Sequence, residues 1–374
     1  MADLPLFLYL NHQLGRLCEV TGTDPVAAGQ LLAELLGPAG AQPLSRPPSW
    51  ASQVADDHTP VEYSVAFNER DRPALRLLGE ALPPAPGPGP NLAAAHRFVE
   101  TQAVRFGLPL ARYAQVRDVF AAVEPFGYAL WQSVVLLPAR PPEFKVYFKP
   151  EVQGVGVAPD LVTEAMGRLG LARSCRAVLE RGARPGELGR ADRLTFFALD
   201  LHSGPHARTK VYLSHHGARA QDLVRAAGIV EGIDPAEIIA CCAITGGGTK
   251  VFAGRPLVGS YTVLATTDRP VGYSVYIPIR DYVGDDEEAA DRVSTLLDRY
   301  GLDSSQFYRA VAAVSRRALR DGVGLIAHVS LRLGPPRPGV TVYLSAEAYQ
   351  VGPPRSRQPA ARNLAGRICP PGGG

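Results

Sequence analysis

Short runs with alternating apolar and polar positions recur in pairs along the chain. Each pair is rich in Val, Tyr, Phe and Thr and is joined by a short polar or Pro/Gly segment, which is the pattern of a β-hairpin. Five such pairs predict ten antiparallel strands, at residues 60–67 with 73–82, 130–139 with 143–150, 194–201 with 208–215, 260–267 with 272–282, and 325–333 with 339–349.

Helical patterns lie between these hairpins. Apolar residues recur at i, i+3 and i+4 spacing after acidic or Ser/Asp starts. The predicted helices cover residues 91–107, 110–123, 159–170, 220–230, 286–301 and 304–319. The N-terminal apolar run predicts the start of an amphipathic helix rather than a signal peptide, because no basic residue precedes it and no A-x-A cleavage site follows.

The second strands of four hairpins share a tetrapeptide with a tyrosine at its third position. The tyrosines Tyr147, Tyr212, Tyr276 and Tyr343 follow one another at intervals of about 65 residues. This period predicts a repeated unit of helices plus one hairpin, and so an α+β fold of five ααββ repeats. A flat sheet with helices on one face is one possible arrangement. A closed ten-stranded barrel with helices outside is favoured, since repetition around an axis removes both sheet edges and leaves a lumen.

The repeats run through most of the chain, so residues 1–351 are predicted to form a single domain. The Pro/Gly-rich segment 83–90 is interpreted as a stiff connector inside the first repeat. The segment 352–374 has no periodicity, and we expect a flexible C-terminal tail.

Side chains two residues apart share one face of a strand, which places Lys145 with Tyr147, and Arg208 and Lys210 with Tyr212. In a barrel, the apolar alternates meet the outer helices and these polar residues point into the lumen, where Arg76 joins them. Buried cations are costly unless they are paired, and the strand motifs offer no matching set of carboxylates. The pattern therefore predicts a polyanionic ligand such as a di- or triphosphate. The alternative is a sheet whose polar face lies in water.

Glu62 lies within the first strand. On the lumen face its carboxylate can accept a hydrogen bond from a substrate N–H or act as a base, and the alternative is a solvated strand residue.

Composition narrows the function further. The net charge of +3 argues against nucleic-acid binding by bulk charge. Only four of the 39 basic residues are lysines, at positions 145, 149, 210 and 250. Five cysteines without C-x-x-C spacing predict neither a disulfide scaffold nor a zinc site. No apolar stretch is long enough to span a membrane, so we expect a cytoplasmic protein.

Three motifs invite other interpretations. The acidic run 285–288 and the pair Asp56–Asp57 do not fit the DDxxD pattern that holds magnesium, and both are better interpreted as helix starts. The segment 243–250 lacks the order of a phosphate-binding loop, which favours the end of a helix. His215–His216 has no partners at metal-ligand spacing. We therefore expect no metal site and no cofactor, with magnesium replaced by the cationic side chains.

The ordered set TPVEYSVAFNE, KVYFKP, RTKVYLS, SVYIPIRDY and VTVYLSAE, spread over residues 50–350, resembles the dimethylallyltryptophan synthase-type aromatic prenyltransferases. That family has the ABBA, or PT-barrel, fold of five ααββ units. The resemblance implies dimethylallyl diphosphate as donor and an indole, usually tryptophan, as acceptor. The short chain is similar to bacterial members that act on free tryptophan.

Carried over by position, the resemblance implies that Glu62 is the catalytic glutamate that holds the indole N–H. It implies an acceptor carboxylate site at Arg193. Diphosphate-binding groups are implied at Arg76, Lys145, Arg208, Lys210, Tyr276 and Tyr343. A tyrosine shield for the carbocation is implied at Tyr147, Tyr212, Tyr276 and Tyr343. Two positions depart from the family: a glutamine is replaced by Ser274, and a lysine linked to deprotonation falls near Gln132.

The predicted function is transfer of a dimethylallyl group to the indole ring of L-tryptophan or a close indole, by a monomer or homodimer. A phenol, naphthalene or peptide acceptor is one alternative, and a non-catalytic barrel that binds a phosphorylated metabolite is another. The attacked ring atom is left open.

Overall fold

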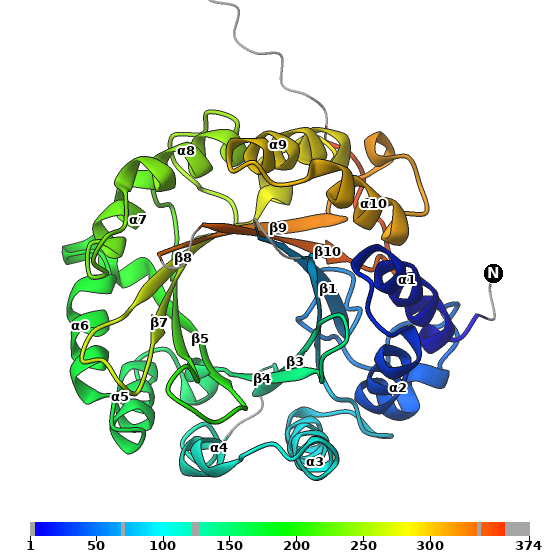
Figure 1. Ribbon diagram of the computed structural model, residues 1–374, viewed down its shortest axis with the longest axis horizontal. Coiled ribbons are helices and arrows are strands. Elements are labelled where there is room, and N and C mark those ends of the chain that lie inside the picture. The colour runs from blue at the N-terminus through cyan, green and yellow to red at the C-terminus, as the bar shows by residue number, and fades with distance from the viewer. Residues whose placement is uncertain (1–3, 69–71, 122–126, 335–337, 356–374) are drawn as a thin grey trace, which may run out of the picture.

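The ten strands form one closed antiparallel ring with helices around it (Figure 1). The computed structural model describes residues 4–68, 72–121, 127–334 and 338–355. Each strand pairs with its neighbours in the sequence, and β1 pairs with β10 to close the ring. The strands are β1 (Val61–Phe67), β2 (Ala74–Gly79), β3 (Leu130–Leu136), β4 (Glu143–Phe148), β5 (Asp192–Asp200), β6 (Thr209–His215), β7 (Leu257–Val263), β8 (Gly272–Ile277), β9 (Ile326–Leu333) and β10 (Gly339–Ser345). The predicted barrel is confirmed over the flat sheet.

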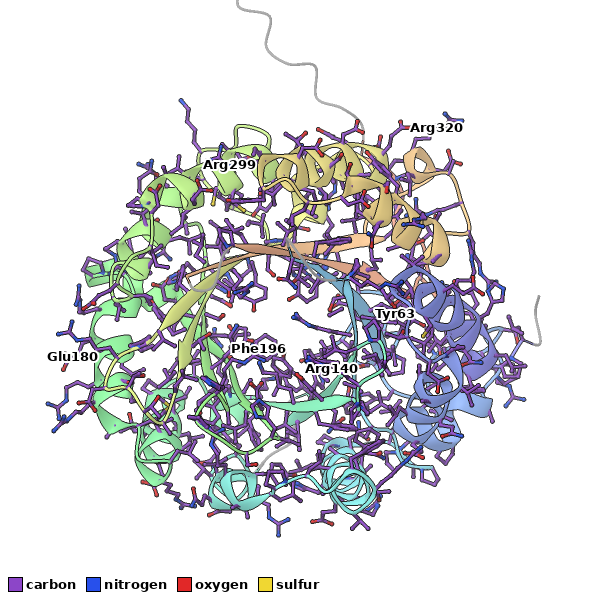
Figure 2. All side chains as sticks on the ribbon, viewed as in Figure 1. Tyr63, Arg140, Glu180, Phe196, Arg299 and Arg320 are labelled. Atoms are coloured by element: carbon purple, nitrogen blue, oxygen red, sulfur yellow. The ribbon has the colours of Figure 1, made fainter. Side chains whose placement is uncertain are left out.

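The helices lie outside the ring, two for each hairpin (Figure 1). They are α1 (Leu6–Thr21), α2 (Pro25–Leu36), α3 (Pro88–Phe106), α4 (Ala111–Val116), α5 (Ala158–Arg168), α6 (Ala172–Gly182), α7 (Ala220–Ala227), α8 (Pro235–Gly246), α9 (Asp286–Arg299) and α10 (Ser304–Val314). The hydrophobic core fills the layer between the helices and the outward side chains of the strands. Tyr63, for example, is fully buried there and its hydroxyl donates to Leu10 O at 2.8 Å (Figure 2).

Several predicted boundaries are wrong. The strand expected at 272–282 stops at Ile277, because Pro278 has no N–H for the ladder and residues 279–281 turn into a 3₁₀ helix. Strand β7 covers 257–263 rather than 260–267, since its apolar content continues upstream. The connector 83–90 is shorter than expected: Pro88 is the first residue of α3, where a proline needs no N–H partner. The helix predicted at 110–123 ends at Val116, residues 117–120 form turns, and residues 122–123 lie outside the described part of the chain.

Helix α1 fastens the beginning of the chain to its end. The Tyr9 hydroxyl donates to Ala346 O at 3.0 Å, 337 residues away in the sequence. The Gln13 amide donates to Ala346 O at 3.0 Å and to Val314 O at 2.9 Å. Because both side chains are buried, these bonds are shielded from water.

The first residues of the predicted tail are attached. Gly352 forms an isolated bridge with Val323, and the Arg355 N–H donates to Gly284 O at 2.7 Å. Residues 356–374 lie outside the described part of the chain, so the flexible tail stays a prediction. None of the described helices combines the length and apolar character needed to cross a membrane, and the cytoplasmic location stays a prediction.

The acidic run at 285–288 is a helix start, as expected. Asp285 caps α9 by accepting from the Glu288 N–H at 2.8 Å. The fully buried Asp286 carboxylate accepts from three backbone N–H groups at the start of β9, at 3.0–3.1 Å, and from Arg317 at 2.5 Å. This carboxylate therefore joins α9 to the barrel wall.

We expect Asp286→Asn to lower the free energy of unfolding by about 2–4 kcal/mol, because an uncharged amide has one acceptor oxygen for four donors. Urea denaturation measures the change. Glu287→Gln, on the neighbouring exposed position, is the control and should cost less than about 0.5 kcal/mol. Equal effects of the two substitutions would show that Asp286 does not join α9 to the barrel.

Candidate active site

Strand register decides which side chains enter the lumen. Residues directly opposite one another on neighbouring strands share a face. Lys145 pairs with Asp200, Tyr147 with Trp131, and Tyr212 with Phe196. Together with Arg208 and Lys210, these side chains confirm the predicted inward Arg/Lys/Tyr face, and Figure 2 places Phe196 inside the ring.

A cationic cage lies toward the hairpin turns of the barrel. The cage residues line one cavity of about 230 Å³ and are Arg76, Lys145, Arg208, Lys210 and Arg332. Sequence reasoning missed Arg332, although it shares the inward face of β9 with Ser330. The carboxylates in the lining of this cavity come from Asp200 and Glu143. The cage therefore carries more positive than negative charge, which favours a polyanionic ligand.

Asp200 is a further site residue that sequence reasoning missed. Its carboxylate accepts from Arg208 Nε at 2.6 Å and lies 3.3 Å from Lys145 Nζ. It holds these two cations in place, while the remaining cage residues face the cavity. The expectation that the strands supply no carboxylate partners needs this correction, because Asp200 lies directly opposite Lys145 in the register.

The two cage lysines are strongly desolvated. Burial lowers the pKa of Lys145 to about 8, although Asp200 acts in the opposite direction. Burial, together with the charges of Arg208 and Arg76, lowers the pKa of Lys210 to about 7. The Lys210 ammonium donates to Ser260 Oγ at 3.3 Å. Both lysines would be stabilised in their charged form by a bound anion.

A row of aromatic rings lies beside the cage. Ring centroids are 6.0 Å apart for Tyr147–Tyr212, 5.6 Å for Tyr212–Tyr276 and 6.1 Å for Tyr276–Tyr343. Burial raises the pKa of Tyr147, Tyr212 and Tyr343, so these side chains stay neutral phenols. The four repeated tyrosines therefore form one continuous surface of π faces, which can stabilise a cation.

Three further aromatic residues extend this surface, and sequence reasoning missed them. Tyr128 stacks on Trp131 with centroids 3.8 Å apart, and Trp131 lies 5.5 Å from Phe196. They form a small apolar cluster with Val54 and Leu78. The period-two pattern could have indicated Phe196 and Trp131, because they pair with Tyr212 and Tyr147.

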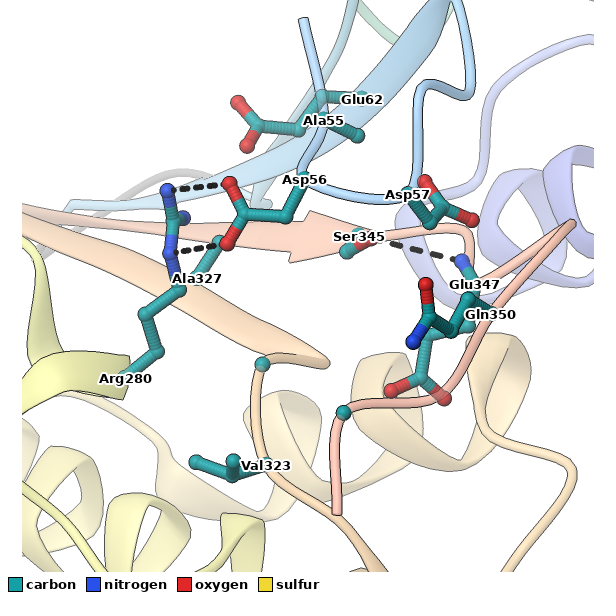
Figure 3. Close-up of a pocket in the computed structure, with 12 residues that line it drawn as sticks. Ala55, Asp56, Asp57, Glu62, Arg280, Val323, Ala327, Ser345, Glu347 and Gln350 are labelled. Atoms are coloured by element: carbon teal, nitrogen blue, oxygen red, sulfur yellow. Dashed lines mark hydrogen bonds and ion pairs between the residues drawn. The ribbon is translucent and has the colours of Figure 1, made fainter. Parts of the chain in front are cut away.

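Glu62 lines a second cavity of about 250 Å³ at the opposite end of the strands (Figure 3). The segment before β1 reaches this cavity because Trp50 and Ser52 donate to the buried Glu80 carboxylate at 3.0 and 2.6 Å. Arg280 there pairs with Asp56, with Nε–Oδ2 at 2.9 Å and Nη2–Oδ1 at 3.0 Å.

The Glu62 side chain is buried, with 6% of the residue exposed. Burial raises its pKa to about 8; the nearby Arg280 opposes the shift and Asp56 adds to it. Its carboxylate forms no hydrogen bond to any residue that the structure describes. An unpaired carboxyl group in a cavity is available to accept from a ligand N–H.

Three other predicted positions have mixed outcomes. Arg193 faces the lumen from β5, and its guanidinium binds Glu151 through Nε at 2.5 Å and Nη2 at 2.8 Å. Its role toward an acceptor carboxylate stays a prediction. Ser274 lines the cage. Gln132 pairs with Val146 and faces the helices, so it does not reach the lumen and is not placed to act as a base.

The motifs set aside have mixed outcomes, and the interpretation of Asp56–Asp57 as a helix start is wrong, because these residues lie in a turn before β1. The segment 243–250 is the end of α8, with Gly247 as its C-cap. Asp57 accepts from the Thr59 hydroxyl and N–H at 2.8 and 3.1 Å. His215 is fully buried beside Asp192. Across the described residues, no group of three or more His, Cys, Asp or Glu side chains could hold a metal ion.

The closed ten-stranded barrel with helices around it agrees with the ABBA-type prenyltransferase fold that the sequence resemblance implies. The family model of tryptophan dimethylallyltransferase matches residues 28–230, and the chain belongs to this family.

Solved structures agree along almost the whole chain. A 6-dimethylallyl tryptophan synthase shares 60% sequence identity with a TM-score of 0.92, over 95% of this chain and 100% of the other. The 6-dimethylallyltryptophan synthase from Micromonospora olivasterospora, solved with DMASPP and Trp, shares 61% with a TM-score of 0.91, over 94% and 100%. The 5-dimethylallyltryptophan synthase from Streptomyces coelicolor shares 34% with a TM-score of 0.85, over 94% and 100%.

The raised pKa of Glu62 predicts a pH-dependent cost in stability. The folded protein holds the Glu62 proton up to about pH 8, whereas an unperturbed glutamate loses it near 4.5. Stability should therefore fall as pH rises between these values. We expect Glu62→Gln to match the parent at pH 4 and to be about 2–4 kcal/mol more stable at pH 9, at about 1.4 kcal/mol per pKa unit.

Urea denaturation across this pH range measures the difference. Glu231→Gln is the control, since 87% of the Glu231 side chain is exposed, and its effect should not vary with pH. A Glu62→Gln advantage that is independent of pH would contradict a raised pKa.

The cage predicts binding of inorganic diphosphate in the presence of EDTA. We expect diphosphate to raise the Tm of the parent, and Lys210→Met to weaken diphosphate binding about 10–100-fold, the worth of one charge-assisted hydrogen bond. Lys250→Met, at an exposed position, is the matched control and should bind like the parent. Calorimetric titration gives the Kd, and an unchanged Kd for Lys210→Met would remove Lys210 from the diphosphate site.

Proposed function

We propose that the protein transfers the dimethylallyl group of dimethylallyl diphosphate to C6 of the indole ring of L-tryptophan and releases diphosphate. The supporting observation is the order of groups in the lumen: the tyrosine row lies between the cationic cage and Glu62. The ring position rests on the names of the two relatives at 60% and 61% identity, both 6-dimethylallyltryptophan synthases.

The cage supplies the donor half of the reaction. When the C1–O bond of the donor breaks, its electron pair leaves with the diphosphate, and negative charge grows among Arg76, Lys145, Arg208 and Lys210. Preorganised cations stabilise this charge more in the transition state than in the ground state. Tyr276 and Tyr343 line the same cavity, and in the proposed reaction their hydroxyls donate to the diphosphate oxygens.

The tyrosine row and Glu62 supply the acceptor half. The π faces of Tyr147, Tyr212, Tyr276 and Tyr343 surround the allylic cation and keep water from it. Glu62 accepts the indole N–H and so fixes which ring carbon faces the cation. The C6 π electrons form the new C–C bond, and transfer of the C6 proton to the released diphosphate restores the aromatic ring.

Magnesium has no role in this proposal, since the cage side chains neutralise the diphosphate directly. All of these groups come from one ring of strands, so the proposal treats residues 1–351 as a single catalytic domain.

An incubation with L-tryptophan, dimethylallyl diphosphate and excess EDTA tests the proposal. We expect a product one dimethylallyl unit heavier than tryptophan, with NMR signals that place the substituent at C6. Above pH 8, where the Glu62 carboxyl is ionised, Glu62→Gln should lower kcat/KM for tryptophan about 10²–10³-fold, because the indole N–H loses its charged acceptor. Glu231→Gln should be unaffected.

Three results would overturn parts of the proposal. A product substituted at another ring atom would overturn the regiochemistry, and activity that needs added magnesium would overturn the metal-free cage. Turnover of phenols or peptides but not of tryptophan would change the acceptor.

A further inference from the structure

His328 on β9 is a polar lumen residue that the proposed reaction does not use. It pairs with Tyr343 in the register, and the two rings meet edge to face with centroids 6.2 Å apart. His328 therefore borders the last tyrosine of the row. Glu62 lies on β1, with β10 between the two strands, a separation of about 10 Å between strand axes.

A β-bulge shapes the wall at this point. Leu344 pairs with Ile326 rather than with Ala327, so Ala327 is the extra residue of β9. Ala327 lines the same cavity as Glu62, Ser345 and Arg280. The bulge thus places Ala327, the residue before His328, in the wall of the acceptor cavity.

Arg280 fixes the hydrogen-bonding role of His328. Its Nη1 lies 3.2 Å from Nδ1 of His328. Arginine can only donate, so Nδ1 must accept and the ring proton must sit on Nε2. Nε2 forms no hydrogen bond to any residue that the structure describes. His328 thus offers one N–H donor to a ligand in the lumen.

The neighbouring arginines and burial keep the His328 imidazole neutral and fixed in orientation. Burial, Arg280 and Arg255 lower the pKa of His328 well below its usual range. Arg280 is itself clamped by Asp56, which also lies 2.9 Å from Arg255. A neutral imidazole adds no positive charge beside the allylic cation and still offers its Nε2–H to a ligand.

We propose that His328, oriented by Arg280, donates its Nε2–H to the α-carboxylate of the acceptor and so selects free amino acids over amines. The proposal rests on the function proposed above. With the indole N–H on Glu62, the amino-acid side of tryptophan can reach His328 two strands away. Arg193, the position implied by family resemblance, lies on the far side of the ring and already has two donors committed to Glu151.

Three acceptors that share the indole ring distinguish the contribution of the α-carboxylate from that of the α-ammonium group. L-Tryptophan carries both, indole-3-propionate carries only the carboxylate, and tryptamine carries only the ammonium. We expect His328→Leu to lower kcat/KM about 10–100-fold for L-tryptophan and indole-3-propionate, mainly by raising KM. For tryptamine, kcat/KM should stay within about threefold of the parent value. His328→Gln keeps an N–H donor and an acceptor for Arg280, so it should retain more of the preference for carboxylates.

Binding provides a second readout. Calorimetric titration with inorganic diphosphate present should show a weaker Kd for L-tryptophan in His328→Leu, with the Kd for tryptamine unchanged. Arg269→Gln, at an arginine whose side chain is 73% exposed, is the control and should leave the tryptophan-to-tryptamine ratio within about twofold of the parent. Thermal melts establish that each variant is folded, and His328→Gln carries the test if His328→Leu is not.

The outcomes separate this proposal from the function on which it rests. Equal losses for all three acceptors would overturn the carboxylate role, as would a carboxylate-dependent loss in Arg193→Gln but not in the His328 variants. A parent enzyme that prenylates none of the three acceptors would instead overturn the proposed function.

Discussion

The ladder of hydrogen bonds between β1 and β10 closes the ring of strands, and the lumen depends on this closure. In an open sheet the polar face would lie in water, and its lysines and tyrosines would be ordinary surface residues. Closure turns the same period-two alternation into an enclosed site. It also places Glu62 on β1 next to the strand that carries Tyr343, although the two residues are far apart in the sequence.

Charge is distributed unevenly along the lumen. The cage end carries an excess of cations, partly balanced by Asp200, whereas Asp56, Asp57, Glu62 and Glu347 line the acceptor end with Arg280. In the proposed function, this asymmetry draws the diphosphate head of the donor to the cage end. Burial disfavours the charged form of the two cage lysines, and in the proposed function the diphosphate would offset this cost. In the proposed function, the cations are thus already in position where the leaving group develops its charge.

Much of the fold can be predicted from the sequence, because each repeat has a recognisable local pattern of strands and turns. Hairpins, the repeated tyrosines and the inward position of Lys145 and Lys210 depend only on period-two alternation and on turn residues. Helices α2 and α8 were harder to find, since PVAAGQLLAELL and PAEIIACCAITG are apolar on most faces and lack a clear amphipathic period. The strand ends were misjudged where apolar content continued past a proline, as at Pro278.

The rest of the site depends on register between strands, which one sequence does not reveal. Asp200 matters because it lies opposite Lys145, and Trp131 because it lies opposite Tyr147. The bulge between Leu194 and Phe196 shifts the alternation of β5 by one residue, so a simple count along the strand misplaces Arg193 or Phe196. Gln132, in contrast, faces outward by simple alternation, because its neighbour Ser133 faces inward opposite Lys145.

The bonds from Tyr9 and Gln13 to the end of β10 have a consequence for how the protein forms. Their acceptors are among the last residues of the barrel to leave the ribosome, so α1 must wait for its partners through most of synthesis. Until then β1 is an open edge, able to pair with other chains. The β9–β10 hairpin is therefore the last part of the barrel to be synthesised, and its pairing covers the open edge of β1. A chain truncated before this hairpin should aggregate rather than fold into a smaller barrel.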